Sequence, residues 1–206
     1  MAMQSIWYFT DLPKEIVDIL DKDISDKFDE SMEESQIGSY TLNKRIRNSK
    51  NAWINTFHWL GGFVWHYIER ANRENFLYDL RCIDGESLQY TKYEEGCFYS
   101  WHNDAGLPEQ YKPSSIANKK GGIADDYLNE QTELVRKLSF VLQLSDPEDY
   151  EGGNLQILDE TGKMYVAPRK RGSIILFDSR AQHRVCKIKK GIRKSIVGWA
   201  VGPRWK

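Results

Sequence analysis

A His-x-Asp unit, His102 and Asp104, ends the strand-like run GCFYSWHND. Residues i and i+2 of a strand point to the same face, so this imidazole and this carboxylate can converge on one ion. A His-x-Asp triplet arises by chance in many sequences, so a metal site is indicated only if a further ligand is present. His183, which opens the run HRVCKI, is the candidate; the alternative is an ordinary loop-end histidine. Two imidazoles and one carboxylate suit non-haem Fe(II) and leave three positions for a bidentate co-substrate and O2.

Arg193 follows His183 by ten residues, in the run GIRKSIVGWAV. The run alternates, so Arg193, Ser195, Val197 and Trp199 are expected on one face of a strand. A charged arginine on an apolar face is costly unless it is paired. The guanidinium fork binds a carboxylate through two hydrogen bonds, so a carboxylate ligand would meet this need. The alternative is an arginine at the mouth of the strand, exposed or paired with an acidic residue of the protein.

Further residues extend this pattern along the chain. The upstream part reads Tyr93-x-x-Gly96-x-x-Tyr99-x-x-His102-x-Asp104, the middle is LSFVLQLSDPEDYEGGNLQI, and the distal part is His183, Arg193 and Trp199. In order and spacing the chain resembles the Fe(II)/2-oxoglutarate-dependent dioxygenases of the prolyl 4-hydroxylase-like branch. The resemblance covers roughly residues 88–203 and is looser in the N-terminal half.

The resemblance implies a double-stranded β-helix, or jelly roll, in which His102, Asp104 and His183 bind Fe(II). Arg193 would hold the distal carboxylate of 2-oxoglutarate. The family's co-substrates are 2-oxoglutarate and O2, with ascorbate as a reductant. Tyr93 matches a tyrosine that contacts the co-substrate. Tyr99 and Trp199 match two positions that line the substrate side of the pocket. For each of these three aromatic residues, the alternative is a plain role in the hydrophobic core.

The resemblance favours hydroxylation of a peptidyl residue, above all proline, in a peptide or protein. A free amino acid or another small metabolite is the nearest alternative. Nucleic-acid dealkylation is disfavoured, because the dealkylases carry a second arginine six residues after the first, where this chain has Trp199. Many prolyl 4-hydroxylases have lysine where Arg193 stands, which leaves the subfamily open. Two other classes also stay open: a non-redox cupin-type metal enzyme and a catalytically silent jelly-roll binding domain.

The elements that must position these residues change character along the chain. Residues 1–83 are expected to be a mainly helical support region, with one helix capped by Thr10 or Asp11 and a second from Trp53 to Leu80. From residue 84, short strand-like runs separated by turn residues predict an antiparallel sandwich or barrel. Together these predict one α+β domain over 1–206, with helices on one face of the sheet, and the resemblance implies that this is a dioxygenase domain. The polar stretch 105–136 is predicted to be a long loop, either a lid or a passive insertion.

Composition narrows the class of protein. The 206 residues carry 29 basic and 30 acidic side chains, a net charge of -1, which argues against binding of nucleic acid through bulk charge as the main role. No apolar run approaches the ~18–20 residues that span a bilayer, and the N-terminus lacks the pattern of a secretory signal. The three cysteines have no metal-like spacing and are expected as free thiols. These features predict a cytoplasmic protein, bacterial or viral, with no membrane partner.

Overall fold

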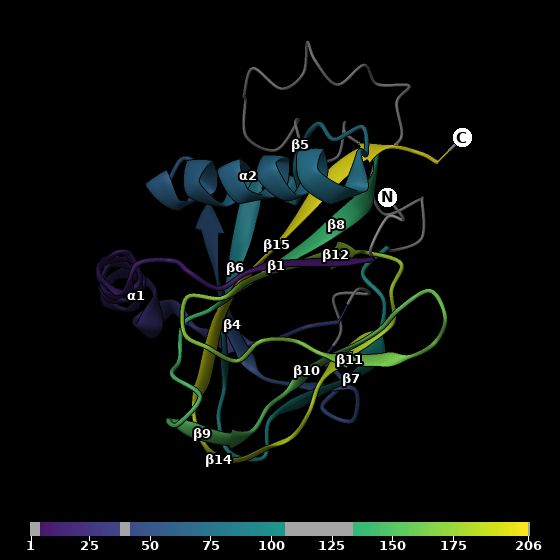
Figure 1. Cartoon of the computed structure of the whole chain (residues 1–206). Helices are drawn as coiled ribbons and strands as arrows, with labels where there is room; N and C mark the ends of the chain where they lie inside the picture. The colour runs from purple at the N-terminus through teal and green to yellow at the C-terminus, as the bar shows by residue number, and fades with distance from the viewer. Residues whose placement is uncertain (1–4, 38–41, 106–133, 206) are drawn as a thin grey trace.

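The computed structural model describes residues 5–37, 42–105 and 134–205. Within these ranges the protein consists of antiparallel strands and two α-helices (Figure 1). The larger sheet has eight strands in the order β1 (Ile6–Phe9), β12 (Ile174–Asp178), β8 (Leu134–Gln143), β15 (Arg193–Pro203), β6 (Ser87–Tyr93), β4 (Lys50–Asn55) and β2 (Glu33–Glu34), with β5 (Cys82–Ile83) paired to β15. The second sheet has the order β11 (Met164–Val166), β10 (Leu155–Leu158), β13 (His183–Val185), β7 (Phe98–His102) and β3 (Arg47–Asn48), and a separate ribbon joins β14 (Ile188–Gly191) to β9 (Tyr150–Gly152).

The two sheets pack face to face through a shared apolar cluster. Val141 and Ile175 come from the larger sheet, and Leu155, Ile157 and Val185 come from the second. All five are at most 7% exposed, so the strands form a sandwich with a closed interior. The antiparallel pattern agrees with the class predicted from the sequence.

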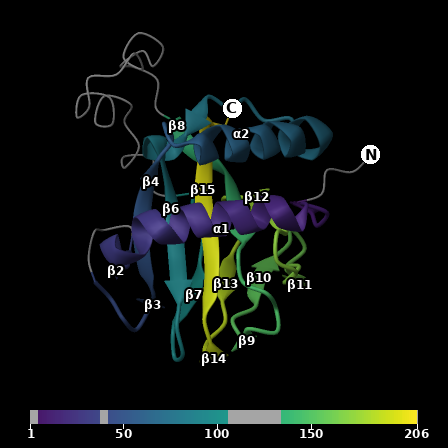
Figure 2. The same cartoon turned by 90° about the vertical axis from the view of Figure 1, so that its left-hand side faces the viewer.

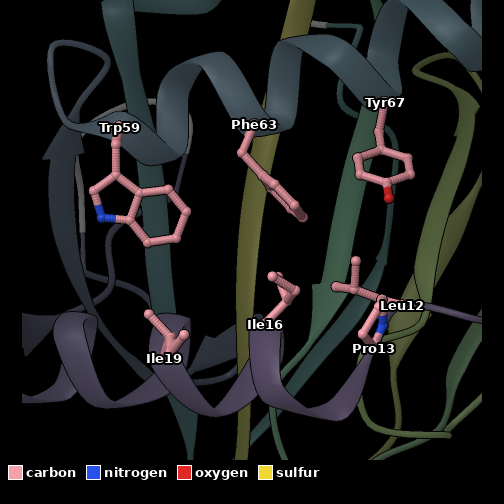
Figure 3. Close-up of a pocket in the computed structure, with 7 residues that line it drawn as sticks. All are labelled: Leu12, Pro13, Ile16, Ile19, Trp59, Phe63 and Tyr67. Atoms are coloured by element: carbon pink, nitrogen blue, oxygen red, sulfur yellow. The ribbon is translucent and has the colours of Figure 1, made fainter.

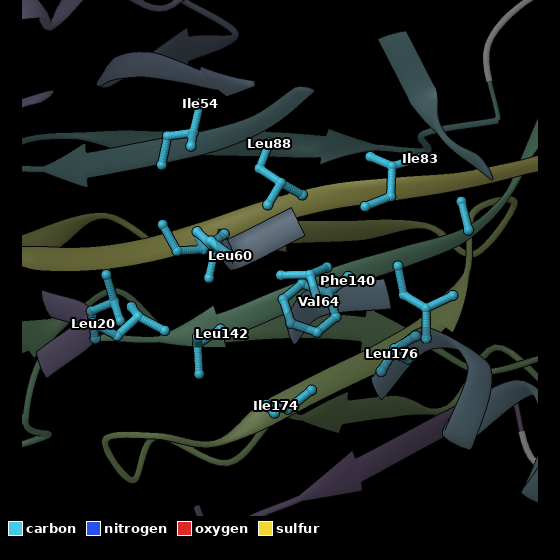
Figure 4. Packing of buried hydrophobic residues seen from close by; sticks show 14 of the residues in the cluster. Leu20, Ile54, Leu60, Val64, Ile83, Leu88, Phe140, Leu142, Ile174 and Leu176 are labelled. Atoms are coloured by element: carbon cyan, nitrogen blue, oxygen red, sulfur yellow. The ribbon is translucent and has the colours of Figure 1, made fainter. Parts of the chain in front are cut away.

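Both helices cover the outer face of the larger sheet. Figure 2 shows α1 (Lys14–Phe28) and α2 (Trp59–Ala71) crossing its strands on the same side. Leu20 of α1 and Leu60 and Val64 of α2 meet Phe140 and Leu142 of β8 in one buried cluster (Figure 4). A fully buried side chain of this size contributes roughly 1.5–3 kcal/mol. The helices therefore cover one face of the larger sheet, and its other face lines the interior of the sandwich.

The alternation of β15 divides its side chains between these two compartments. Ile196 and Ala200 belong to the cluster under the helices. Val197 packs against the cluster between the sheets, and Arg193 and Trp199 share its side of the strand because side chains alternate with a period of two. The charged residue thus enters the interior of the sandwich.

An apolar groove lies between the two helices on the outside of the molecule. It is lined by Leu12, Pro13, Ile16, Ile19, Trp59, Phe63 and Tyr67 (Figure 3). The larger sheet separates this groove from the interior of the sandwich, where the chemistry-bearing residues lie. Neither α1 nor α2, nor any other helix in the described ranges, is long and apolar enough to cross a lipid bilayer.

The second helix is shorter than the sequence pattern predicts. Trp53 lies in strand β4, where Trp53 pairs with Gln89 of β6 and Ile54 is buried on the opposite face. The helix begins at Trp59, after the Nδ1 atom of His58 accepts a hydrogen bond from the Leu60 N–H. Its α-helical part ends at Ala71 and continues as a π-helical turn, Asn72–Phe76. In the strand Ala52 and Ile54 are buried and Trp53 between them is exposed, whereas their sequence is a short continuous apolar run that does not distinguish a strand from a helix.

The N-terminal part also contributes strands to both sheets. β1, β2, β4 and β5 join the larger sheet and β3 joins the second. These strands have two to six residues and pair with partners distant in the chain, so local patterns carry little sign of them. Of the predicted loop over 105–136, residues 106–133 lie outside the described residues, whereas Leu134, Val135 and Arg136 already belong to β8.

Candidate active site

The two sequence-predicted histidines and Asp104 meet at one end of the second sheet. β7 and β13 are antiparallel neighbours, and His102 stands directly opposite His183 in their register. Asp104 follows two residues after β7 ends. One donor atom from each of the three residues lies within 4.8 Å of the other two. Across the described ranges, this is the one group of histidine, cysteine and acidic side chains close enough to share an ion.

Backbone carbonyls orient both imidazoles. The Nδ1–H of His102 donates to the Ser100 carbonyl oxygen at 2.7 Å, and that of His183 donates to the Ala181 carbonyl oxygen at 3.0 Å. A carbonyl only accepts, so each Nδ1 carries a proton and each Nε2 is the atom available to bind a metal ion. The His183 Nε2 lies 3.3 Å and the His102 Nε2 3.7 Å from the Asp104 carboxylate. This is the orientation that a metal ion requires of two histidine ligands.

Two serines fix the carboxylate of Asp104. The Ser139 hydroxyl, from β8 of the larger sheet, donates to Oδ2 of Asp104 at 2.7 Å. The Ser179 hydroxyl lies 3.0 Å from that of Ser139, and the Asp104 N–H donates to the Ser179 carbonyl oxygen at 2.8 Å. Such outer partners hold a ligand in place and commonly affect metal affinity by about 10- to 100-fold. Sequence reasoning missed Ser139, although a serine inside the apolar run LSFVLQL is a signal of a polar contact.

The charge state of the three residues is close to what a metal site needs, namely an ionised carboxylate and neutral imidazoles. Burial lowers the pKa of His102 to about 4, and the charge of His183 adds to that shift. Burial alone would raise the pKa of Asp104, but the two histidines outweigh it and lower the pKa below its usual range. Burial lowers the pKa of His183, but the negative charge of Asp104 raises it by more, so the pKa of His183 lies above its usual value. At neutral pH, therefore, His102 is neutral, Asp104 is ionised, and His183 is the group that holds a proton most tightly.

We expect the metal affinity to depend on the proton of a single residue, His183. A metal ion binds only neutral imidazole, so it must displace the proton of His183, whose pKa is raised, whereas His102 is already deprotonated. Below the pKa of His183 the apparent Kd for Co(II) should rise about tenfold per pH unit, and above it the Kd should be flat. Titration of the Co(II) absorption bands over a pH series measures this. A rise of about 100-fold per unit in the same range would mean that both histidines titrate there and would contradict the assignment.

Arg193 lies in the sandwich interior without a counter-charge. It is 2% exposed, and its Nη2 donates to Oε1 of Gln143 at 2.9 Å while Nη1 reaches the Ser195 hydroxyl at 3.5 Å. Its buried Nε has no hydrogen-bond partner among the described residues, and none of their carboxylates forms an ion pair with it. Burial lowers the pKa of Arg193. A buried unpaired charge is costly, so this arginine has the character of a receptor for an anion.

Tyr93 stands beside Arg193, as the two residues oppose each other in the β6–β15 register. The guanidinium carbon of Arg193 lies 5.5 Å from the centre of the Tyr93 ring. Tyr93 is 4% exposed and packs into the cluster between the sheets. The tyrosine that the resemblance assigns to the co-substrate site therefore lies next to the arginine.

The two aromatic residues expected on the substrate side, Tyr99 and Trp199, come from β7 and β15. The Tyr99 ring stacks on the His102 imidazole, with centroids 3.5 Å apart and planes 17° apart, and burial raises the pKa of Tyr99 to about 12. Trp199 is buried, its Nε1 has no partner within the described part of the chain, and its ring lies 6.5 Å from that of Trp53. Arg47, which sequence reasoning missed, lies 4.8 Å above the Tyr99 ring. Tyr99 thus covers the His102 ring directly, whereas Trp199 stands opposite Ser139, the partner of Asp104, in the β15–β8 register.

Comparisons with known proteins identify a family that agrees with the resemblance seen in the sequence. The family model of the 2OG-Fe(II) oxygenase superfamily matches residues 88–201. A PKHD-type hydroxylase of Synechococcus sp. (strain CC9311) is 45% identical over 86 residues, which are 41% of this chain and 39% of that protein. The match thus spans about two fifths of that relative's length.

Solved structures share the fold of the whole chain. A Pseudomonas putida prolyl-4-hydroxylase superposes with a TM-score of 0.68 at 17% identity, covering 98% of this chain and 94% of that one. A Trichoplax adhaerens prolyl hydroxylase, solved with a peptide fragment of the hypoxia inducible factor oxygen degradation domain, gives a TM-score of 0.72 at 17% identity and covers 95% and 83%. At this identity the likeness concerns the fold.

Proposed function

Because the chain belongs to the 2OG-Fe(II) oxygenase superfamily, we propose that it is an Fe(II)- and 2-oxoglutarate-dependent oxygenase that hydroxylates a C–H bond. The observation that carries the proposal is the combination of two sites in one interior: three convergent metal-ligand side chains and a buried arginine without a counter-charge. A metal site alone fits many enzymes. A metal site that shares its pocket with an unpaired arginine calls for a ligand that both chelates and carries a distant negative charge, as 2-oxoglutarate does.

His102, Asp104 and His183 would hold the iron. Two imidazoles and one carboxylate are the donor set that suits non-haem Fe(II), and the tautomers set by Ser100 and Ala181 leave both Nε2 atoms free to bind it. When bound, Fe(II) supplies the redox chemistry that couples O2 reduction to decarboxylation of 2-oxoglutarate. The protein contributes the ligands, their orientation through Ser139, and a pocket that limits access of water.

Arg193 would bind the distal carboxylate of 2-oxoglutarate, with Tyr93 packed beside it. Its unpartnered Nε supports this, because a carboxylate would supply the missing acceptor. The charges also balance: Asp104 and the 2-oxoglutarate dianion carry three negative charges, which Fe(II) and Arg193 neutralise. A desolvated cation that gains its counter-charge only on ligand binding favours the dicarboxylate over mono-acids of similar length.

We further propose that the two packed sheets form a double-stranded β-helix and that residues 1–206 make one dioxygenase domain. Three points support this. The site draws on both sheets, because His102 and His183 come from the second and Ser139 and Arg193 from the larger. The cluster between the sheets is continuous. The solved prolyl hydroxylases above match the chain over nearly its full length.

For the substrate we propose a peptidyl prolyl residue. Two solved structures that share the fold are prolyl hydroxylases by name, which supports a prolyl substrate, and one of them was solved with a peptide. In this chain Tyr99 and Trp199 supply an aromatic wall that suits a pyrrolidine ring. One oxygen atom of O2 would enter the C–H bond and the other would enter succinate, with CO2 released.

The proposal predicts that 2-oxoglutarate is converted to succinate in step with substrate hydroxylation. The assay uses the protein with Fe(II), 2-oxoglutarate, O2 and ascorbate, and a panel of proline-containing peptides, and measures succinate and hydroxyproline by mass spectrometry. We expect one hydroxyl group per succinate with an accepted peptide and loss of both products in His183→Ala. Conversion of 2-oxoglutarate without any hydroxylated peptide would reject the prolyl substrate but keep the reaction class. Absence of conversion under all conditions would reject the enzyme.

A further inference from the structure

The turn between β12 and β13 provides three of the contacts that orient the metal ligands. The Ser179 carbonyl oxygen accepts the Asp104 N–H at 2.8 Å. The Ser179 hydroxyl lies 3.0 Å from that of Ser139, which donates to the Asp104 carboxylate. The Ala181 carbonyl oxygen accepts the Nδ1–H of His183 at 3.0 Å. The placement of two of the three ligands therefore depends on the conformation of one short turn.

Asp178 closes this turn with its side chain and with its backbone. Its Oδ1 accepts the backbone N–H of Arg180 at 2.8 Å and the Nε–H of the same residue at 2.9 Å, and its Oδ2 accepts from Nη2 at 2.6 Å. Its carbonyl oxygen accepts the Ala181 N–H at 2.9 Å. An aspartate that accepts from the backbone two residues further on is a common way to fix a turn. Asp178 thus sets the directions of the Ser179 and Ala181 carbonyl groups.

A further hydrogen bond to Asp178 comes from the helical side of the molecule. The Tyr78 hydroxyl donates to Oδ2 of Asp178 at 2.7 Å. Burial raises the pKa of Tyr78 and this bond adds to the shift, so the phenol stays protonated and remains a donor. Burial opposes ionisation of Asp178, but the bonds from Arg180 and Tyr78 outweigh it and lower the pKa of Asp178. An ionised carboxylate, only 8% exposed, is therefore held from two sides.

The end of α2 presents Tyr78 to this carboxylate. After the π-helical turn, Leu77 adopts a φ of +55°, which is uncommon for a residue with a side chain. The Asn72 side chain then spans the reversal, because its Oδ1 accepts the Tyr78 N–H at 2.8 Å and its Nδ2 donates to the Tyr78 carbonyl oxygen at 2.9 Å. Both π-helical turns and such strained residues are frequent at functional sites. The helix end therefore holds the phenol in a defined position beside the turn.

Trp205 packs on both partners of Asp178. Its ring meets the Tyr78 ring edge to face, with centroids 4.5 Å apart, and the Arg180 guanidinium lies 4.0 Å from its centre. The Nζ of Lys137 lies 4.0 Å from the same ring, and the Lys137 carbonyl oxygen accepts the N–H that follows Asp178 at 3.0 Å. These contacts restrict the tyrosine and the arginine to the positions from which they bond the carboxylate.

We propose that Asp178, held by Tyr78, is a positioning residue for the metal site. It acts through the turn between β12 and β13, which orients the Asp104 carboxylate and the His183 imidazole toward the same ion. This rests on the proposed function. It gives the end of α2 a role beyond covering the sheet, and it predicts that loss of a carboxylate that is not itself a ligand weakens metal binding.

The test replaces Asp178 with asparagine, which keeps the shape but removes the charge and one acceptor oxygen. Equilibrium dialysis of the metal-free protein with Co(II) should show a Kd raised by about 10- to 100-fold, the range for outer partners of metal ligands. Tyr78→Phe keeps the ring and removes one hydrogen bond, so it should raise the Kd by less. The matched control is Asp159→Asn. Asp159 fixes the β10–β11 turn in the same manner, accepting the Thr161 N–H at 2.9 Å, and its loss should leave Co(II) binding as in the wild type.

Proton NMR of the Co(II)-loaded protein distinguishes positioning from general damage. The Nδ1 protons of the two bound imidazoles give separate, strongly shifted signals that exchange with solvent. The Nδ1–H of His183 depends on the turn through Ala181, whereas that of His102 depends on Ser100 of β7. In Asp178→Asn we expect one of these signals to be lost to faster exchange and the other to remain as in the wild type.

The outcomes separate this inference from the function on which it rests. Weaker Co(II) binding with loss of one signal supports the positioning role. If Asp178→Asn binds Co(II) like the wild type while His183→Ala does not, the inference fails alone. It also fails if both signals change together, or if Asp159→Asn loses as much affinity. Should Asp178→Asn not fold, unchanged Co(II) binding in Tyr78→Phe overturns the inference. A wild-type protein that does not bind Co(II) would instead reject the proposed function.

Discussion

Replacing His183 with alanine is expected to abolish metal binding at physiological concentrations. His183 supplies one of three donor atoms, and its imidazole is also the nearer histidine partner of the Asp104 carboxylate, at 3.3 Å. Loss of an outer-shell partner costs about 10- to 100-fold in metal affinity, so loss of a ligand should cost more than about 100-fold. Equilibrium dialysis with Co(II) measures the Kd directly, without depending on any substrate.

A second histidine provides the control for that experiment. His66 is exposed on α2, where its ring contacts Tyr67, on the far side of the larger sheet from the three ligands. His66→Ala should bind Co(II) like the wild type. Equal loss of Co(II) in both variants would point to general damage, and wild-type affinity in His183→Ala would contradict the metal site.

Replacing Arg193 with methionine should separate ligand binding from stability. Truncating one partner of a buried charge pair commonly costs 2–5 kcal/mol, so the Kd of 2-oxoglutarate should rise roughly 30- to 4000-fold. In the ligand-free protein the same change removes a buried cation without a counter-charge and substitutes an apolar side chain of similar length. The free energy of unfolding should therefore not fall, despite the lost hydrogen bonds to Gln143 and Ser195.

Arg171→Met is the matched control. Arg171 pairs with Asp18 and Asp21 of α1 on the helical side of the molecule. Its loss should lower stability slightly and leave 2-oxoglutarate affinity unchanged. Denaturant unfolding and calorimetry measure the two quantities. A strongly destabilised Arg193→Met that still binds 2-oxoglutarate would assign the arginine a structural role.

The sequence was informative about this site because its residues lie on strands with a clear period of two. His102 and Asp104 are close because they are two residues apart, and Arg193 enters the interior because β15 alternates between two apolar environments. The meeting of His183 with His102 depends on the pairing of β13 with β7, which spacing alone does not determine. There the resemblance to a family supplied what local patterns lack.

What sequence reasoning missed depends on contacts between distant segments. Ser139 reaches Asp104 from the other sheet, and Arg47 reaches the Tyr99 ring from β3. A serine inside the apolar run LSFVLQL signals a polar contact, but neither residue shows from its own strand which distant segment it meets. Trp53 was assigned to a helix because tryptophan and isoleucine fit either period over so short a run, and only its pairing with Gln89 decides the strand.

The most direct test of the account is an anaerobic titration of the metal-free protein with Fe(II) and then 2-oxoglutarate, followed by visible absorption. The account predicts a weak charge-transfer band that requires both additions, is absent in His183→Ala, and needs far more 2-oxoglutarate in Arg193→Met. The band would show chelation of the co-substrate at the iron without any knowledge of the substrate. A wild-type protein that gives no band, and behaves like both variants, would contradict the assignment of this interior as an iron and 2-oxoglutarate site.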